Sequence, residues 1–316
     1  MNSNYTPAQS AIIAFNFMTL KFLESIIIFM TRFFIITVIT LFSFQVSAQK
    51  VLVDIFIPST VLIKYNSEGS ASGVIVGDSS YMYLVTARHC FFNEVNKNLS
   101  LIDSLASLVY YTNDAFGGKS DTLQVNLSSA LKQRDLLFDP VNDIAVLTIA
   151  KITGNTPSGK QIFNYTSSTT KVSKLAPGGI TLDLCLDFKM VDVGEDCTII
   201  GYPASLQIRG EHDYDFQRPL LRKGAIAGKD ITRGSIIVDC PSYQGNSGGP
   251  VFATSINDKF NIGLVGVVSR AILLVEQLES SYYKTTVSIN RVNSGYTVVV
   301  PIEFAKALMV IRRTFK

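Results

Sequence analysis

Short apolar runs separated by polar turns dominate the chain after residue 50. Apolar and polar residues often alternate within them, and many apolar positions are β-branched or aromatic, which is typical of half-buried β-strands. The first group of predicted strands covers 51–57, 60–65, 72–76, 81–86, 107–111, 122–126 and 144–149. Residues 78–80 supply one turn, and 117–119 (Gly-Gly-Lys) predict a hairpin tip.

A second group of strands follows a segment rich in Gly, Ser, Thr and Lys at about 151–174, which we interpret as a connection between two strand groups. Its predicted members are 197–200, 223–227, 235–238, 250–253, 262–269, 285–289 and 296–300. A helix is then predicted to begin at Pro301, because apolar residues recur at helical spacing after it. These residues are Phe304, Leu308, Ile311 and Phe315. The pattern alone predicts an all-β sandwich or barrel with a C-terminal helix.

The first 48 residues lack this alternation. Residues 30–32 (Met-Thr-Arg) give a short basic start, 33–44 are predominantly apolar, and 46–48 (Val-Ser-Ala) fit a small-residue cleavage site. We interpret 30–48 as a secretory signal peptide cut after Ala48, with Met18 or Met30 as alternative starts of translation. An uncleaved signal anchor is the alternative, but the charge-free stretch is short for a membrane span of ~20 residues. The sequence therefore predicts a secreted or periplasmic protein that meets a membrane only during export.

Composition is that of a globular protein. Of the 316 residues 47% are apolar, which excludes a disordered chain and supplies a core. The net charge of +3 is small, and no long basic run interleaved with aromatic residues occurs, so we expect no nucleic-acid partner. Four cysteines, Cys90, Cys185, Cys197 and Cys240, allow three pairings in an exported protein. Cys185 and Cys197 flank a predicted hairpin and form the preferred pair.

The hexapeptide 245–250 (GNSGGP) is the strongest chemical signal in the sequence. Its glycines permit a tight turn in which backbone N–H groups converge on one point, as an oxyanion hole requires. Ser247 also needs a general base and a group that orients the base. His89 ends an apolar, strand-like run, whereas His212 lies in a polar segment, and Asp143 directly precedes another apolar run. We therefore predict His89 as base, Asp143 as orienting acid and Ser247 as nucleophile.

The motifs TARHC (86–90), NDIAVL (142–147) and GNSGGP, in this order and spacing, resemble the three catalytic motifs of the chymotrypsin-like (trypsin-like) serine proteases. The resemblance implies two six-stranded antiparallel β-barrels followed by a C-terminal α-helix, with the active site between the barrels. The corresponding domains are an upstream extension and signal peptide at 1–48, a first barrel at 49–160, and a second barrel with the helix at 161–316.

The resemblance also implies a role for each site residue. His89 would take the proton of Ser247, and Asp143 would fix the tautomer of the imidazole. The backbone N–H groups of Gly245 and Ser247 would hold the oxyanion. Ser269 matches a serine that in this family often supports the orienting aspartate.

Several segments depart from the digestive members of this family. Residues 193–203 and 222–226 look closer to bacterial trypsin-like proteases of the HtrA type, although the residues after the second barrel leave no room for a PDZ domain. Asn246 stands where digestive enzymes carry an aspartate that pairs with the new amino terminus, so activity without zymogen cleavage is expected. Cys90 follows the catalytic histidine as in many animal relatives, but 70–74 lacks the partner cysteine, and Cys90 is expected to be free.

The resemblance assigns the primary specificity pocket to 241–245 and 268–271. Its predicted lining is Pro241, Ser242, Tyr243, Val268, Ser269 and Ala271. Because Pro241 stands where cleavage after Lys or Arg would require an acid, we expect cleavage after small or medium apolar residues. We infer no metal or other cofactor, since the acidic segment 211–215 is interpreted as a solvated loop rather than a calcium site.

These inferences predict an exported serine endopeptidase that cleaves polypeptide substrates through an acyl-enzyme. One alternative is a non-catalytic protein-binding module on the same fold, although such proteins normally lose a triad residue. Another is an esterase, but the order His, Asp, Ser differs from that of the α/β-hydrolases, in which the serine comes first.

Overall fold

The computed structural model describes residues 21, 23–37, 56–67, 69–96, 98–111, 120–157, 161–171, 177–203, 215, 217–255, 262–279, 282 and 286–315. The chain divides into two compact units, 1–50 and 51–316. In the first, 23–37 are helical with exposed side chains, and the described part of the chain contains no helix long and apolar enough to cross a membrane. The predicted cleavage site, 51–55 and the hairpin tip at 117–119 lie outside the described residues.

The first group of strands forms one ten-stranded sheet instead of the expected six-stranded barrel. The strands are β1 Thr60–Tyr65, β2 Ser70–Gly77, β3 Tyr81–Thr86, β6 Leu105–Tyr111, β7 Ser120–Asn126, β8 Leu136–Phe138, β9 Ala145–Asn155, β10 Gln161–Tyr165, β11 Thr169–Lys171 and β12 Ile180–Thr181. Their hydrogen-bonded order is β10-β9-β3-β2-β1-β6-β7-β11, with β8 on β9 and β12 on β2. The β12 pair is parallel, and the others are antiparallel. A small separate hairpin joins β4 Phe92–Val95 to β5 Asn98–Leu101.

The sheet continues past the domain boundary predicted at residue 160. The segment 151–174, interpreted from sequence as a connection, instead contains the end of β9 together with β10 and β11. β10 and β11 form the two ends of the sheet. On β10, Phe163 and Tyr165 pack against the core, whereas Gln161, Ile162 and Asn164 are exposed. The boundary between the two strand groups therefore falls after Thr181.

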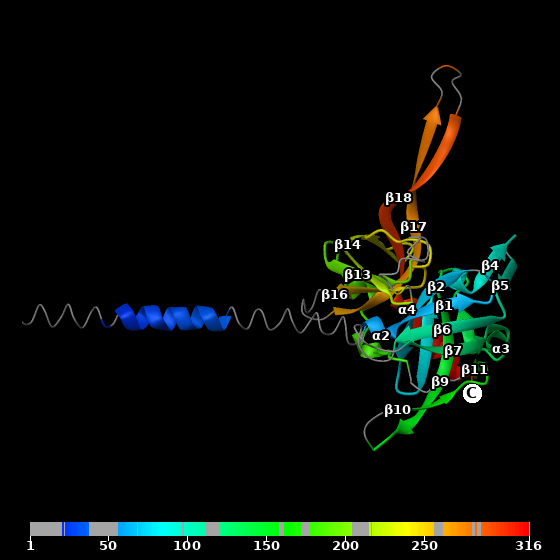
Figure 1. Ribbon diagram of the computed structural model, residues 1–316, viewed down its shortest axis with the longest axis horizontal. Helices are drawn as coiled ribbons and strands as arrows, with labels where there is room; N and C mark the ends of the chain where they lie inside the picture. Colours follow the sequence, from blue (N-terminus) through cyan, green and yellow to red (C-terminus); the bar gives the residue numbers. More distant parts are fainter. Residues whose placement is uncertain are drawn as a thin grey trace, which may run out of the picture. The chain divides into compact units, whose positions relative to one another are not determined.

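The second group forms a closed barrel of six strands, as predicted. They are β13 Asp196–Gly201, β14 Leu220–Asp230, β15 Ser235–Asp239, β16 Pro250–Thr254, β17 Ile262–Glu279 and β18 Thr286–Pro301, in the order β13-β14-β15-β18-β17-β16. The all-β class with a C-terminal helix is thus confirmed. β17 runs beyond the end predicted at Ser269, and β18 joins two segments that were predicted as separate strands. The far part of the β17–β18 hairpin, orange in Figure 1, extends away from the barrel.

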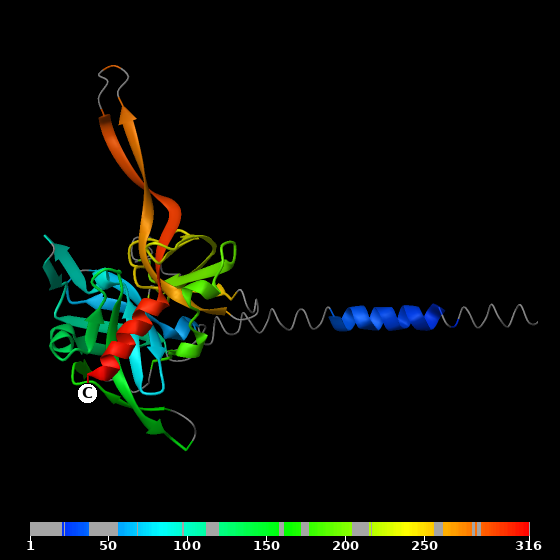
Figure 2. The ribbon, with the colours of Figure 1, turned by 180° about the vertical axis from the view of Figure 1, so that it is seen from behind.

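Short helices occur at α2 Ile57–Ser59, where the end of a strand was predicted, and at α3 Leu127–Lys132. The longer helix α4, Ile302–Thr314, begins directly after Pro301. Its buried residues are Ile302, Ala305, Leu308 and Met309, whereas Ile311 and Phe315 of the predicted stripe are exposed. The helix lies against the first sheet (Figure 2), where its Arg312 pairs with Asp135 at 2.6 Å.

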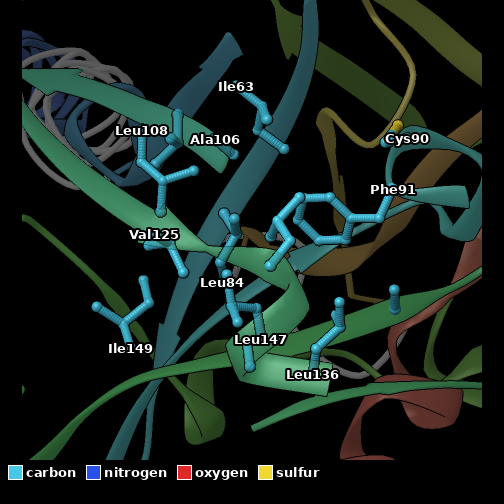
Figure 3. Close-up of a cluster of buried hydrophobic side chains, with 14 of the residues drawn as sticks. Ile63, Leu84, Cys90, Phe91, Ala106, Leu108, Val125, Leu136, Leu147 and Ile149 are labelled. Carbon is cyan, nitrogen blue, oxygen red and sulfur yellow. The ribbon is translucent and has the colours of Figure 1, made fainter. Parts of the chain in front are cut away.

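Besides the core inside the second barrel, two buried clusters hold these parts together. One lies within the first sheet and is shown in Figure 3, with Ile63, Leu84 and Leu147 among its fully buried members. The other is shared by both strand groups and α4. In it the rings of Phe56, before β1, and Phe252, in β16, stack at 3.9 Å. Burial of a core that spans both groups fixes the junction where the predicted site residues meet.

All four cysteines are buried and free, so the predicted Cys185–Cys197 pair is wrong. Cys185 packs in the core shared by both strand groups, while Cys197 packs inside the second barrel. Burial raises the pKa of Cys90, Cys185 and Cys197 to about 12 and that of Cys240 to about 11. The thiols are therefore neutral and unreactive in the folded protein.

Candidate active site

His89 lies in a short 3₁₀ turn, Arg88–Cys90, directly after β3. Its backbone N–H donates a hydrogen bond to Asp143 Oδ1 at 3.0 Å, and its ring Nδ1 lies 2.8 Å from Asp143 Oδ2. Both oxygens of one carboxylate therefore hold this residue, one through the backbone and one through the ring. The second ring nitrogen, Nε2, is left for chemistry in the cavity that the imidazole lines.

Asp143 precedes β9 and receives a third hydrogen bond from the second barrel. Ser269 Oγ, on β17, donates to Asp143 Oδ2 at 2.6 Å. Burial alone would raise the pKa of Asp143. The hydrogen bonds and charge of His89 and the hydrogen bond of Ser269 together lower it by more than burial raises it, so that pKa lies below the ordinary range of a carboxyl group. An ionised carboxylate favours the tautomer with the proton on Nδ1, which makes Nε2 an acceptor.

The turn that carries Ser247 connects β15 to β16 and depends on glycine. Gly245 has φ 97° and Gly248 φ 78°, a region that favours glycine. A Cβ on Gly248 would overlap the Thr86 hydroxyl and the Ser72 carbonyl. The first sheet can therefore approach this turn only because position 248 lacks a side chain.

Two backbone donors in this turn are left for a ligand. Asn246 N donates to Tyr243 O at 2.9 Å, and Gly248 N to Val268 O at 2.7 Å. By contrast, nothing in the described part of the chain accepts a hydrogen bond from the N–H of Gly245 or of Ser247. Two such donors on either side of a nucleophile are what stabilisation of an oxyanion requires.

Ser72, on β2, ties this turn to the first sheet. Its N–H donates to Ser247 O at 2.8 Å, and its Oγ donates to Gly245 O at 2.7 Å. The same Oγ accepts from Tyr202 N at 3.0 Å, and Thr86 Oγ1 donates to the Ser72 carbonyl at 2.7 Å. The fully buried Ser72 thus binds the carbonyl groups of both neighbours of Asn246, Gly245 and Ser247. Sequence reasoning missed it, because a serine within an apolar strand gives no sign of a partner so far along the chain.

The Asn246 side chain does not anchor the turn through its oxygen. The residue is buried, and its Oδ1 has no hydrogen-bond partner among the described residues. The turn is held by Ser72 of the first sheet, through its bonds to Gly245 O and Ser247 O.

The predicted catalytic side chains face one cavity of about 610 Å³. It is lined by Arg88, His89, Val141, Asp143, Ser242, Tyr243, Gln244, Ser247, Ser269, Arg270, Ala271 and Leu273. Of the predicted pocket residues, Pro241 and Val268 do not line it, and Val268 is buried in the barrel core. Among the described residues, which include both Ser247 and His89, no hydrogen bond joins Ser247 Oγ to the His89 imidazole. In many hydrolases this bond tightens only when substrate binds.

The wall of this cavity has a polar but uncharged support that sequence reasoning also missed. Thr297 Oγ1 donates to Ser242 Oγ at 2.9 Å, and Asn293 Nδ2 donates to Ser242 O at 2.6 Å. Both partners come from β18, far along the chain from the predicted pocket. Their bonds hold Ser242 in place, and the Thr297 hydroxyl is fully buried.

No metal site emerges in the part of the chain that the structure describes, where no three His, Cys, Asp or Glu side chains cluster suitably. Of the acidic segment 211–215, only Asp215 is described. Its carboxylate accepts from Tyr111 Oη at 2.7 Å and lies 3.8 Å from Arg218.

Comparison with known proteins identifies the family. The family described as trypsin-like peptidase domain matches residues 71–257, which include the motifs that carry His89, Asp143 and Ser247. The chain therefore belongs to the trypsin-like peptidases, a family of serine proteases. No curated protein matches the sequence.

Several solved structures are similar to this chain at low identity. A serine endoprotease from Yersinia pestis is 16% identical over 84% of this chain and 65% of its own, with a TM-score of 0.43. Deg5 is 17% identical over 84% of this chain and 91% of its own, with a TM-score of 0.45. The HtrA-type protease AlgW is 16% identical over 80% of this chain and 60% of its own, with a TM-score of 0.43. The chain spans less than two thirds of the Yersinia protease and of AlgW.

Proposed function

We propose that this protein is an exported serine endopeptidase in which Ser247 is the nucleophile, His89 the general base and Asp143 the orienting acid. One observation supports this most: Ser247, with two adjacent backbone donors that have no acceptor, lines the same cavity as an imidazole held by a carboxylate. A structural role alone does not require this combination.

The proposed reaction follows from these positions. His89 Nε2 takes the proton of Ser247 as Oγ attacks the carbonyl carbon of the scissile bond, and the new oxyanion accepts hydrogen bonds from Gly245 N and Ser247 N. The carbon–nitrogen bond then breaks, and His89 gives its proton to the leaving amine. Water repeats the sequence on the acyl-enzyme, which releases the acid and restores the serine. Asp143 stays ionised throughout and stabilises the imidazolium.

The proposed preference is for small or medium apolar residues before the scissile bond. Ser242, which lines the cavity, and its hydrogen-bond partner Thr297 are both uncharged, so neither offers a carboxylate to Lys or Arg. Ala271 adds a methyl group to the cavity wall. A peptide library in which basic residues dominate this position would contradict the preference without affecting the proposed nucleophile.

Export is proposed from the sequence of 30–48. Production of the full chain in a bacterial host tests it, because mass spectrometry of the mature protein would give an amino terminus at residue 49. A mature protein that retains 30–48 would support the anchor alternative.

Labelling with a fluorophosphonate probe tests the nucleophile. Wild type should be labelled and should hydrolyse β-casein, and Ser247→Ala should lose both activities by several orders of magnitude. Ser59→Ala is the control, since it also removes a serine hydroxyl but lies outside the cavity. Its labelling should equal that of wild type. If folded wild type neither reacts with the probe nor cleaves casein, the alternative of a non-catalytic binding module is favoured.

A further inference from the structure

The far part of the β17–β18 hairpin exposes apolar side chains on two long strands. Leu273, Leu274 and Val275 are each 52% exposed, and Leu278 and Ile289 are 56% exposed. Exposed apolar strands favour aggregation, and soluble proteins normally shorten, cover or charge them. A surface of this kind is retained where it binds something.

The register divides these residues between the two faces of the hairpin. Leu273 pairs with Asn293, Val275 with Arg291, and Gln277 with Ile289. Cross-strand partners share a face and successive residues alternate, so Leu273, Val275 and Ile289 lie on one face. Leu274, Leu278 and Val292 lie on the other. No register shift interrupts the pairing between Leu273 and Leu278.

Leu273 connects one of these faces to the active site. It lines the cavity that also contains His89 and Ser247. We call Leu273, Val275 and Ile289 the cavity-side strip. At about 3.3 Å per strand residue, Val275 lies about 7 Å beyond Leu273, and the Gln277–Ile289 pair about 13 Å beyond it.

This continuity determines what can occupy the strip. β17 forms the cavity wall at Ser269 and Ala271, which belong to the pocket proposed for the residue before the scissile bond. The same strand then leads to the strip, so a polypeptide held in that pocket continues along it with its preceding residues. A small ligand that fills only the cavity would not reach Val275 or Ile289. An unfolded polypeptide can present the four to six consecutive extended residues that reach from the pocket to the strip.

We propose that the cavity-side strip is an extended substrate-binding surface for unfolded polypeptides that carry apolar side chains several residues before the scissile bond. This inference rests on the proposed endopeptidase function. The strip supplies apolar contact area beyond the pocket, which lowers KM for long substrates and leaves the chemistry at Ser247 unchanged.

The test compares three peptides that share one scissile bond, taken from a site at which the full-length wild-type protein cuts β-casein. They differ in the length and the composition of the segment before that bond. One has four residues before the scissile bond. A second adds six residues rich in Leu and Val, and a third adds six rich in Ser and Asn. For wild type, kcat/KM should be at least tenfold higher on the long apolar peptide than on the other two, mainly through KM.

Two double variants separate the faces of the hairpin. Val275→Lys with Ile289→Lys should bring the long-to-short ratio of kcat/KM to about one. Leu274→Lys with Leu278→Lys, on the opposite face, is the matched control and should keep the wild-type ratio. Equal loss in both double variants, or a wild-type ratio near one, would overturn the proposal.

Two further outcomes have distinct meanings. If light scattering shows a wild-type dimer that the strip variant alone converts to monomer, the strip binds a second copy and the proposal is wrong. If wild type cleaves neither casein nor any peptide and the probe does not label Ser247, the proposed function itself fails. If wild type is active but its kcat/KM is the same on the long apolar and the short peptide, only the proposed role of the cavity-side strip is rejected.

Discussion

His89 and Ser247 line the same cavity but are held there by different means. His89 is oriented by side-chain chemistry, since both oxygens of Asp143 bind it and Ser269 binds Asp143 in turn. Ser247 is positioned by the backbone, through a glycine with positive φ and the hydrogen bonds of Ser72 to the peptide groups around Asn246.

This difference matters because the proposed mechanism asks something different of each half. The histidine half would transfer a proton, and its supports are the Asp143 carboxylate and the Ser269 hydroxyl. The serine half would aim two N–H groups at one point, and its supports are hydrogen bonds to backbone carbonyls. Variants of the first half should change proton transfer, and variants of the second should change oxyanion stabilisation.

Asp143→Asn should have the largest effect in this comparison. The amide cannot favour the productive tautomer of His89, and kcat should fall by about 10⁴-fold, the size found for this substitution in a trypsin-type triad. Steady-state kinetics on casein-derived peptides measures it. Asp103→Asn is the matched control: it also removes a carboxylate that accepts backbone hydrogen bonds, but outside the cavity, and should keep full activity. A loss below tenfold in Asp143→Asn would show that His89 does not depend on this acid.

Gly245→Ala should have the next largest effect. At φ 97° an alanine is strained, and relief of the strain turns the Gly245 N–H away from the oxyanion site. We expect kcat to fall by about 10²–10³-fold with little change in KM. Gly194→Ala places the same strain at φ 92°, with open space around it and away from the cavity. Equal kcat losses in the two variants would mean that strain alone, and not the oxyanion site, is responsible.

Ser72→Ala should lower kcat about tenfold, since it keeps the backbone bond to Ser247 and removes only the hydroxyl that holds the Gly245 carbonyl. The rate of fluorophosphonate labelling should fall in parallel, whereas KM should not change. Ser59→Ala removes another buried hydroxyl and should leave both rates unchanged. If kcat is unchanged in Ser72→Ala, the Ser72 hydroxyl does not help to position Gly245 for catalysis.

Ser269→Ala should have the smallest effect, a loss of a few fold in kcat together with a pH-dependent loss of stability. Because the pKa of Asp143 is lowered on folding, its carboxylate stabilises the protein at neutral pH, and this contribution disappears as pH falls through the folded-state pKa. Without the hydroxyl, the pKa of Asp143 rises towards its ordinary value. The free energy of unfolding at pH 7 should drop by about 1–2 kcal/mol. Urea unfolding should show that the difference in free energy of unfolding between wild type and Ser269→Ala is smaller at pH 3 than at pH 7. A difference that does not depend on pH would contradict the role of Ser269.

Local sequence signals predicted much of this fold and part of the site. β1 and β3 match their predicted bounds because both are short runs rich in β-branched and aromatic residues that end at turns. β10 was missed because it lies in a stretch rich in Gly, Ser, Thr and Lys, and only its Phe163 and Tyr165 pack against the core. The far half of β17 was missed because residues 272–275 are apolar without alternation, and only the structure shows that both of its faces are exposed.

The unpredicted site residues share one property: their partners lie far away in the chain. Ser72 acts on a turn 173 residues later. Thr297 and Asn293 act on Ser242 from β18. A motif contains residues that are close in sequence, so it identified His89 and Ser247 as candidates, but it contained no information on the distant residues that position them.

The position of Ser72 also links the proposed active site to the contact between the two strand groups. The hydroxyl that binds the Gly245 carbonyl belongs to β2 of the first group, and His89 and Asp143 come from that group as well. Under the proposed function, a copy whose two strand groups separate loses the base, the acid and the support of Gly245 together. We therefore expect an unfolding intermediate of this kind to be inactive.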